Sequence, residues 1–153
     1  MKTAETSLHQ VRIFIESEAG SDQKRRYDSA TLERLDASTL ARPYPFPYGF
    51  ILDTRGEDGD NVDCYVITSR PLRSGRIVTA EPVGMLEQVE DGEIDHKILL
   101  VLPGDNAVCD DAAVEAIRQF IYRIFAEFPS ATVEVGKMLG ADVAEAHIRA
   151  SAT

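Results

Sequence analysis

The chain has 153 residues, 44% of them apolar, which is a common size for one domain with its own hydrophobic core. Its 26 acidic and 16 basic residues give a formal net charge of -10. This charge opposes binding to nucleic acid or to an anionic membrane, so we expect neither partner. The first ten residues are polar and no later stretch approaches the ~20 apolar residues that span a bilayer. We therefore expect a single domain, residues 1–153, in the cytoplasm.

Short β-strands are predicted over the first two-thirds of the chain. Residues 11–15 alternate apolar and polar side chains, as a half-buried strand does. Proline and glycine separate several further apolar stretches of four to six residues. These additional predicted strands cover residues 62–67, 77–80, 83–86 and 97–102.

Two helices are predicted in the last third. Asp110 and Asp111 suit a helix N-terminus, and the apolar residues after them recur at three- and four-residue steps as far as Phe128, before Pro129. A second, short helix is predicted over about residues 142–150. Strands followed by helices predict a mainly β fold with α: a small closed barrel with a long and a short C-terminal helix packed outside.

Acidic residues are concentrated after an aromatic, proline-rich segment. Asp58, Asp60 and Asp63 lie within six residues, and carboxylate oxygens are the ligands that Mg²⁺ and Mn²⁺ prefer. Gly59 and Asn61 favour a turn that would let the three carboxylates converge. The alternative is a solvated acidic turn that only keeps the protein in solution.

A second pair of charges supports the functional interpretation. Asp95 and Lys97 are two residues apart at the start of an apolar strand, so their side chains should project from the same face. A carboxylate beside an ammonium group is what a site for metal ions and phosphate requires.

These motifs together resemble the soluble family I inorganic pyrophosphatases. The chain carries the tyrosine-proline-x-x-tyrosine-glycine block at Tyr44–Gly49, and the aspartate-glycine-aspartate-x-x-aspartate signature at Asp58–Asp63. An acid-x4-aspartate-x-lysine strand follows at Glu90–Lys97, and the segment from Glu16 to Lys24 resembles the family's glutamate-to-lysine segment.

The resemblance implies a five-stranded closed barrel of the oligonucleotide-binding (OB-like) type and hydrolysis of pyrophosphate to two phosphates. It implies Mg²⁺, or Mn²⁺ in its place, and a metal-bridged water as nucleophile with Asp60 as general base. It also implies a homo-oligomer, most simply the hexamer of bacterial members. The implied metal ligands are Asp58, Asp63, Asp95 and Glu90, with Glu16 supporting them. The implied substrate contacts are Lys24, Arg34, Lys97, Tyr48 and Tyr44, although tyrosines in such a loop are more often packing residues.

The sequence departs from the family pattern at three places. Arg26 stands where a second glutamate is expected, and Asn61 stands where a proline is expected. The helical tyrosine-lysine pair that binds phosphate in the family falls on Ile124-Phe125, which cannot bind phosphate. Tyr122-Arg123 lies two residues earlier, about 200° around the helix. We expect Arg26 to contact phosphate in place of the missing lysine.

Two hypotheses therefore stand. The first is a divergent, active pyrophosphatase, which the joint presence of Asp58, Asp60, Asp63, Asp95 and Lys97 favours. The alternative is a catalytically silent relative that acts as a metal-binding or assembly subunit, which the changes at Arg26 and Ile124-Phe125 favour.

Overall fold

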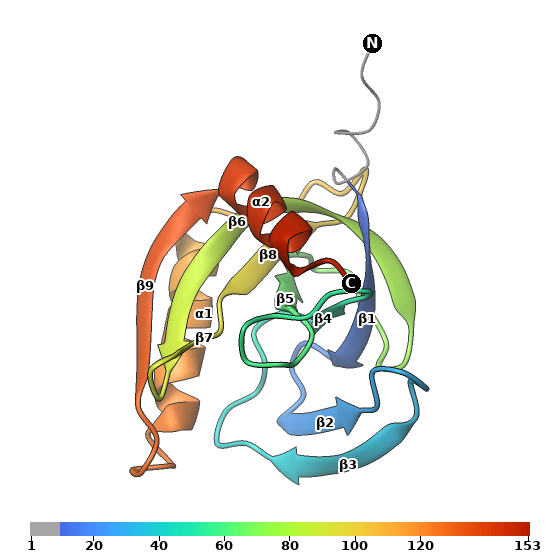
Figure 1. Ribbon diagram of the computed structural model, residues 1–153. Coiled ribbons are helices and arrows are strands. Elements are labelled where there is room, and N and C mark those ends of the chain that lie inside the picture. The colour runs from blue at the N-terminus through green and yellow to red at the C-terminus, as the bar shows by residue number, and fades with distance from the viewer. Residues whose placement is uncertain (1–9) are drawn as a thin grey trace.

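The computed structural model describes residues 10–153, so residues 1–9 of the expected domain lie outside the described part of the chain. Over the described residues a mainly β fold carries two helices (Figure 1). The elements are β1 (Val11–Ser17), β2 (Gln23–Tyr27), β3 (Arg34–Thr39), β4 (Tyr48–Ile51), β5 (Asp63–Val66), β6 (Ile77–Glu90), β7 (Glu93–Ile94), β8 (Lys97–Val101), α1 (Asp111–Phe125), β9 (Val133–Gly140) and α2 (Ala141–Ser151).

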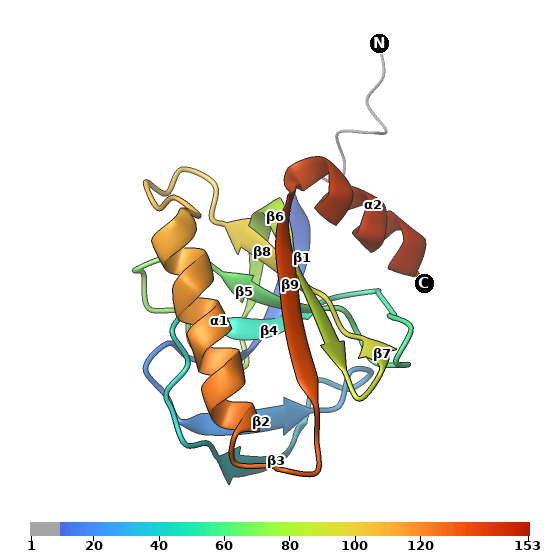
Figure 2. The same ribbon diagram turned by 90° about the vertical axis from the view of Figure 1, so that its left-hand side faces the viewer.

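Five of the strands form a closed ring. The order is β1, β4, β5, β8 and β6, and β6 then pairs with β1 again. The β5–β8 pair is parallel, and the other pairs of the ring are antiparallel. Both helices lie outside this ring, and α1 runs beside β9 (Figure 2). The expected five-stranded ring with a long and a short C-terminal helix outside is confirmed.

Strand β6 differs from the sequence prediction, which divided it in two at Pro82. It is one strand of 14 residues. Its register shifts between Pro82 and Gly84, and such a bulge tolerates a proline because no ladder N–H is needed there. The first part of β6 pairs with β1, and the rest pairs with β8 and then with β9. One bent strand therefore closes the ring and also supports the outer strand β9.

Helix α1 begins as expected but ends earlier. The Asp110 Oδ1 atom accepts a hydrogen bond of 2.9 Å from the Ala113 N–H, which caps the N-terminus. The helix ends at Phe125, because the N–H groups of Glu127 and Phe128 bond to carbonyls three residues earlier and tighten the last turn. Strands β2, β3, β4, β7 and β9 were not predicted.

The core has two parts. Apolar side chains from the strands fill the ring, and α2 adds Ala144 and Ile148 to them. A second cluster lies between the outer face of the sheet and α1, which contributes Ile117, Phe120 and Ile121. No helix within residues 10–153 is both long and apolar enough to cross a membrane.

Candidate functional site

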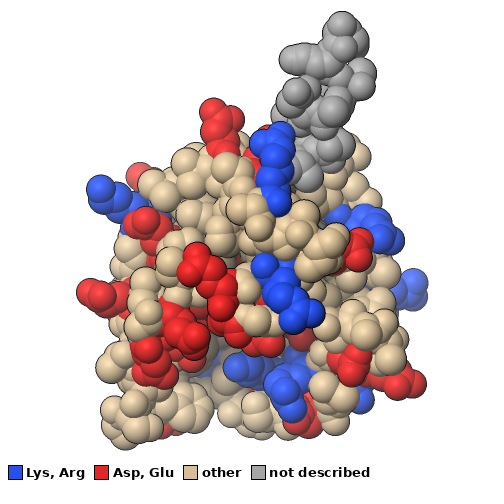
Figure 3. Space-filling view, in the orientation of Figure 1, with Lys and Arg blue, Asp and Glu red and all other residues tan. Residues whose placement is uncertain are grey.

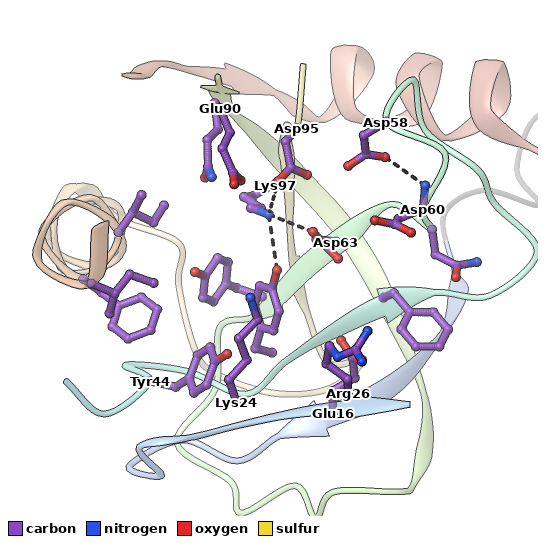
Figure 4. Close-up of a pocket in the computed structure, with 18 of the residues that line it drawn as sticks. Glu16, Lys24, Arg26, Tyr44, Asp58, Asp60, Asp63, Glu90, Asp95 and Lys97 are labelled. Carbon is purple, nitrogen blue, oxygen red and sulfur yellow. Dashed lines mark hydrogen bonds and ion pairs between the residues drawn. The ribbon is translucent and has the colours of Figure 1, made fainter. Parts of the chain in front are cut away.

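A cavity of about 490 Å³ lies between the ring, the β2–β3 hairpin and α1. On the molecular surface, acidic and basic side chains face each other around a hollow in the lower half of the view (Figure 3). The cavity is lined by every sequence-predicted site residue except Arg34: Glu16, Lys24, Arg26, Tyr44, Tyr48, Asp58, Asp60, Asp63, Glu90, Asp95 and Lys97 (Figure 4).

Lys97 is the centre of this site. Its Nζ atom donates hydrogen bonds to Asp63 Oδ2 at 2.8 Å, Asp95 Oδ2 at 3.1 Å and the Tyr48 hydroxyl at 3.2 Å. Burial by itself lowers the pKa of the ammonium group, but the two carboxylates more than offset this and the pKa lies above its usual value. Lys97 therefore remains a buried cation that partly neutralises the acids around it.

The acidic groups near Lys97 are only partly compensated. Burial raises the pKa of Asp95, and the charge of Asp63 adds to this shift while Lys97 opposes it. Burial, reinforced by the charge of Asp63, raises the pKa of Glu16 to about 8. The cavity therefore holds more negative charge than its own cations neutralise, and a bound cation would relieve this.

The loop between β4 and β5 turns as the sequence predicted. Gly59 has a φ of 89°, a conformation that glycine adopts readily. The Asp58 Oδ1 atom accepts a hydrogen bond of 3.0 Å from the Asp60 N–H, and the Asn61 amide donates one of 2.8 Å to the Thr54 carbonyl. This turn brings Asp58 and Asp60 to the same side of the cavity as Asp63 (Figure 4).

The donor set fits a hard divalent cation, because carboxylates from three separate segments line one cavity. Within residues 10–153, no three histidine, cysteine or acidic side chains already lie close enough together to hold a metal ion. Lys97 instead forms ion pairs with Asp63 at 2.8 Å and Asp95 at 3.1 Å, and carboxylates this close repel one another unless a cation lies between them.

Tyr44 and Tyr48 pack and also line the cavity. Their rings stack with centroids 5.2 Å apart, and the Tyr44 ring lies 4.9 Å from the ring of Phe120 on α1. Tyr48 also contacts Lys97 through its hydroxyl group. The two tyrosines thus connect the charged part of the cavity to the helix.

The β2–β3 hairpin positions the basic residues unequally. Lys24 and Arg26 are two residues apart on β2, so they share one face of the strand, and both line the cavity. Arg34 lies on the exposed strand β3 and does not line the cavity. The expected contribution of Arg34 to this cavity is therefore not seen, because β3 belongs to a separate two-stranded sheet and is solvent-exposed along its whole length. The Arg26 guanidinium forms a bidentate ion pair with Asp36, at 2.9 and 2.7 Å.

Helix α1 contributes an apolar wall made of Phe120, Ile121, Ile124 and Phe125. Tyr122 and Arg123 do not line the cavity, so they do not replace the expected tyrosine-lysine pair. The Tyr122 hydroxyl instead accepts a hydrogen bond of 2.9 Å from the Val135 N–H on β9.

Gln88 is a cavity residue that the sequence analysis missed. It is 2% exposed, and its Oε1 atom is the one buried side-chain polar atom in the described part of the chain that has no hydrogen-bond partner. Its position two residues before Glu90 on a strand predicts the same facing direction, so the signal was present in the sequence.

Comparison with known proteins gives a consistent family match. The model of the family described as inorganic pyrophosphatase matches residues 13–153. A curated inorganic pyrophosphatase of Synechocystis is 40% identical over 95 residues, which are 60% of this chain and 55% of the relative. One from Neisseria meningitidis is 36% identical over 63% of this chain and 55% of its own length. The chain thus spans about half the length of these curated relatives.

Solved structures extend the likeness to nearly the whole chain. The inorganic pyrophosphatase of Thermus thermophilus matches with a TM-score of 0.85 and 27% identity, over 94% of this chain and 89% of that protein. The Coxiella burnetii protein matches with the same TM-score at 22% identity, over 94% of each chain, and supports the OB-like fold.

The raised pKa of Glu16 predicts a stability effect in chelator-treated protein. Because its folded-state pKa of about 8 lies above the unfolded value near 4.5, ionising Glu16 costs folding free energy as pH rises between these values. We expect Glu16→Gln to be more stable than the parent protein by at least ~1 kcal/mol at pH 8, and by much less at pH 5. Urea unfolding at both pH values, with chelator present, measures this. An equal effect at the two pH values would contradict it.

Proposed function

The chain belongs to the inorganic pyrophosphatase family, and we propose that it hydrolyses pyrophosphate to two phosphates with a divalent metal ion. The observation that carries the proposal is the convergence of family-type carboxylates with Lys24, Tyr48 and Lys97 on one cavity. The match over residues 13–153 supports the same assignment.

We assign metal binding to Asp58, Asp63, Asp95 and Glu90, with Glu16 beside them, and to Mg²⁺ in the first place, with Mn²⁺ as the alternative. All five carboxylates line the cavity, and four of them come from loops or strand ends that can adjust to an ion. A bound divalent ion neutralises phosphate oxygens and lowers the pKa of a coordinated water.

Asp60 is assigned as the general base. It is an exposed residue on the turn that lines the cavity, and no hydrogen bond to Lys97 occupies its carboxylate, in contrast to Asp63 and Asp95. A carboxylate in this position can take the proton of the attacking water as the new bond to phosphorus forms.

The basic and hydroxyl groups are assigned to the phosphate oxygens. Lys97 and Tyr48 lie together at the centre of the cavity, and Lys24 reaches it from β2 (Figure 4). Charge-assisted hydrogen bonds from such groups stabilise the charge that develops on the departing phosphate. Tyr44 supports Tyr48 by stacking.

The proposal predicts metal-dependent turnover that depends on Asp60. We expect phosphate release from pyrophosphate with Mg²⁺, its loss in chelator, and a 10²- to 10⁴-fold lower kcat for Asp60→Asn, because an amide cannot accept the proton. Mg²⁺ binding by calorimetry should persist in that variant. No phosphate release from the parent protein would favour the alternative, a silent metal-binding or assembly subunit.

Arg26 is assigned to phosphate, since it lines the cavity beside Lys24 and keeps its charge at any accessible pH. Arg26→Glu is expected to raise the KM for pyrophosphate at least tenfold, because a carboxylate repels the substrate. Asp36→Asn, which releases the guanidinium from its ion pair, is the matched variant and should lower the KM. If Arg26→Glu instead lowers the Mg²⁺ concentration for half-maximal activity with an unchanged KM, Arg26 merely occupies a lost metal position.

We further propose that the protein acts in the cytoplasm and that it is a homo-oligomer, in the first place the hexamer implied by its resemblance to bacterial members. Several large apolar side chains are exposed on the surface of the single chain, among them Ile77, Val108 and Phe128, and association with further copies would cover them. Light scattering at micromolar concentration should give a multiple of 16.9 kDa, and a mass near 16.9 kDa would contradict the assembly.

A further inference from the structure

The cavity has two chemically different ends. Asp58, Asp60 and Asp63 lie at one end, and Phe120, Ile121, Ile124 and Phe125 form a wall at the other. A series of contacts orders the residues between them: Asp63 to Lys97, Lys97 to Tyr48, Tyr48 to Tyr44, and Tyr44 to Phe120. A ligand that reaches from the acids to α1 must therefore present phosphate at one end and an apolar group at the other.

The wall is accessible rather than wholly committed to packing. Ile124 and Phe125 are half-buried, and both border the cavity although they also contact the cluster under α1. The volume of about 490 Å³ falls within the ~300–1,000 Å³ of pockets that hold drug-sized organic ligands. An inorganic anion gains nothing from apolar side chains at the far end, whereas an organic group buries surface against them.

Gln88 adds an independent polar signal between the two ends. Its buried Oε1 atom accepts no hydrogen bond from the described residues, and an unpaired buried acceptor costs about 1–3 kcal/mol. Gln88 lies on β6, which pairs with β9 on one side, and the Gln88 carbonyl accepts a hydrogen bond of 2.9 Å from the Asp95 N–H, so Gln88 lines the cavity between the acids and the helix. A ligand with a hydrogen-bond donor near its apolar group would satisfy this acceptor.

We propose that the site takes phosphoanhydrides in which one phosphate carries an organic group with an apolar face and a hydrogen-bond donor. A nucleoside diphosphate is the simplest ligand of this kind. The inference rests on the proposed function, since it uses the same acids, and it extends that function to a class of substrate. The terminal phosphate lies toward Asp60, and the organic group lies on the wall formed by α1.

The reaction then follows from this orientation. The water oxygen forms a bond to the terminal phosphorus and its proton passes to Asp60, while the bond from that phosphorus to the bridging oxygen breaks. The bridging oxygen keeps the electron pair and remains on the esterified phosphate, next to Lys97 and Tyr48. The products are inorganic phosphate and a phosphate monoester.

Binding of two non-hydrolysable ligands in the presence of Mg²⁺ tests the proposal. Methylenediphosphonate and adenosine 5′-(α,β-methylene)diphosphate differ only by the adenosine group. We expect calorimetry to show that the adenosine compound binds at least tenfold more tightly. Equal or weaker binding of the adenosine compound would overturn the proposal, and it would leave the hydrolysis of pyrophosphate, assayed separately, as an independent result.

Variants locate the preference on the wall. Phe125→Lys should reduce the ratio of the two affinities at least tenfold, because it replaces the apolar surface with a charge that favours the bare diphosphonate. Val143→Lys is the control, since Val143 on α2 is 41% exposed and does not line the cavity, so its ratio should equal that of the parent protein. Retained binding of methylenediphosphonate shows that each variant is folded.

Gln88→Leu tests the polar contact. It should lower the affinity for the adenosine compound about tenfold relative to that for methylenediphosphonate, because it removes the acceptor while keeping a similar volume. Ile124→Lys serves as the second wall variant if Phe125→Lys does not fold. An affinity ratio that neither wall variant nor Gln88→Leu changes would place the organic group elsewhere and overturn the assignment.

Discussion

The site depends on the buried ammonium group of Lys97 between Asp63 and Asp95. Strands β5 and β8 form the parallel pair of the ring, with Cys64 opposite Ile98, and this register brings Asp63 next to Lys97. A shift by one residue would turn Lys97 toward the other face of the sheet and leave a buried charge unpaired, which costs several kcal/mol. The electrostatics of the site and the register of the ring therefore stabilise each other.

The same ammonium group also connects the acidic side chains to helix α1 through a series of contacts. It binds the Tyr48 hydroxyl, Tyr48 stacks on Tyr44, and Tyr44 packs on Phe120. The position of α1 relative to the acids is thus set by direct contacts as well as by the apolar core between the helix and the sheet. A site built partly on strands and partly on a packed helix keeps the separation of its two ends fixed, which a site on loops alone would not.

Much of this arrangement could be predicted from the sequence, for identifiable reasons. Asp58 and Asp60 are close in sequence, and so are Asp95 and Lys97. A turn in the first case and the two-residue period of a strand in the second determine where their side chains point. Strands β2 and β3 gave no signal, because their exposed or half-exposed residues lack an apolar face. The position of Arg34 depends on how that hairpin is placed against the ring, and long-range packing decides this placement. Gln88 shares its strand direction with Glu90, but an uncharged amide gave no chemical reason to assign it to the site.

The charge balance of the cavity links the substitutions on β2 and α1. Eight acidic and four basic side chains line the cavity as far as the structure describes it. With Ile124-Phe125 on α1, the helix adds no cation to this set, and Arg26 supplies one from the opposite side of the cavity. Positive charge in the cavity is thereby concentrated at β2 and Lys97, whereas α1 offers an apolar wall that favours groups which benefit from leaving water. Under the proposed function, the departures at Arg26 and at Ile124-Phe125 therefore act together: they leave the acids and Lys97 in place and change the kind of group that the far end of the cavity would accept.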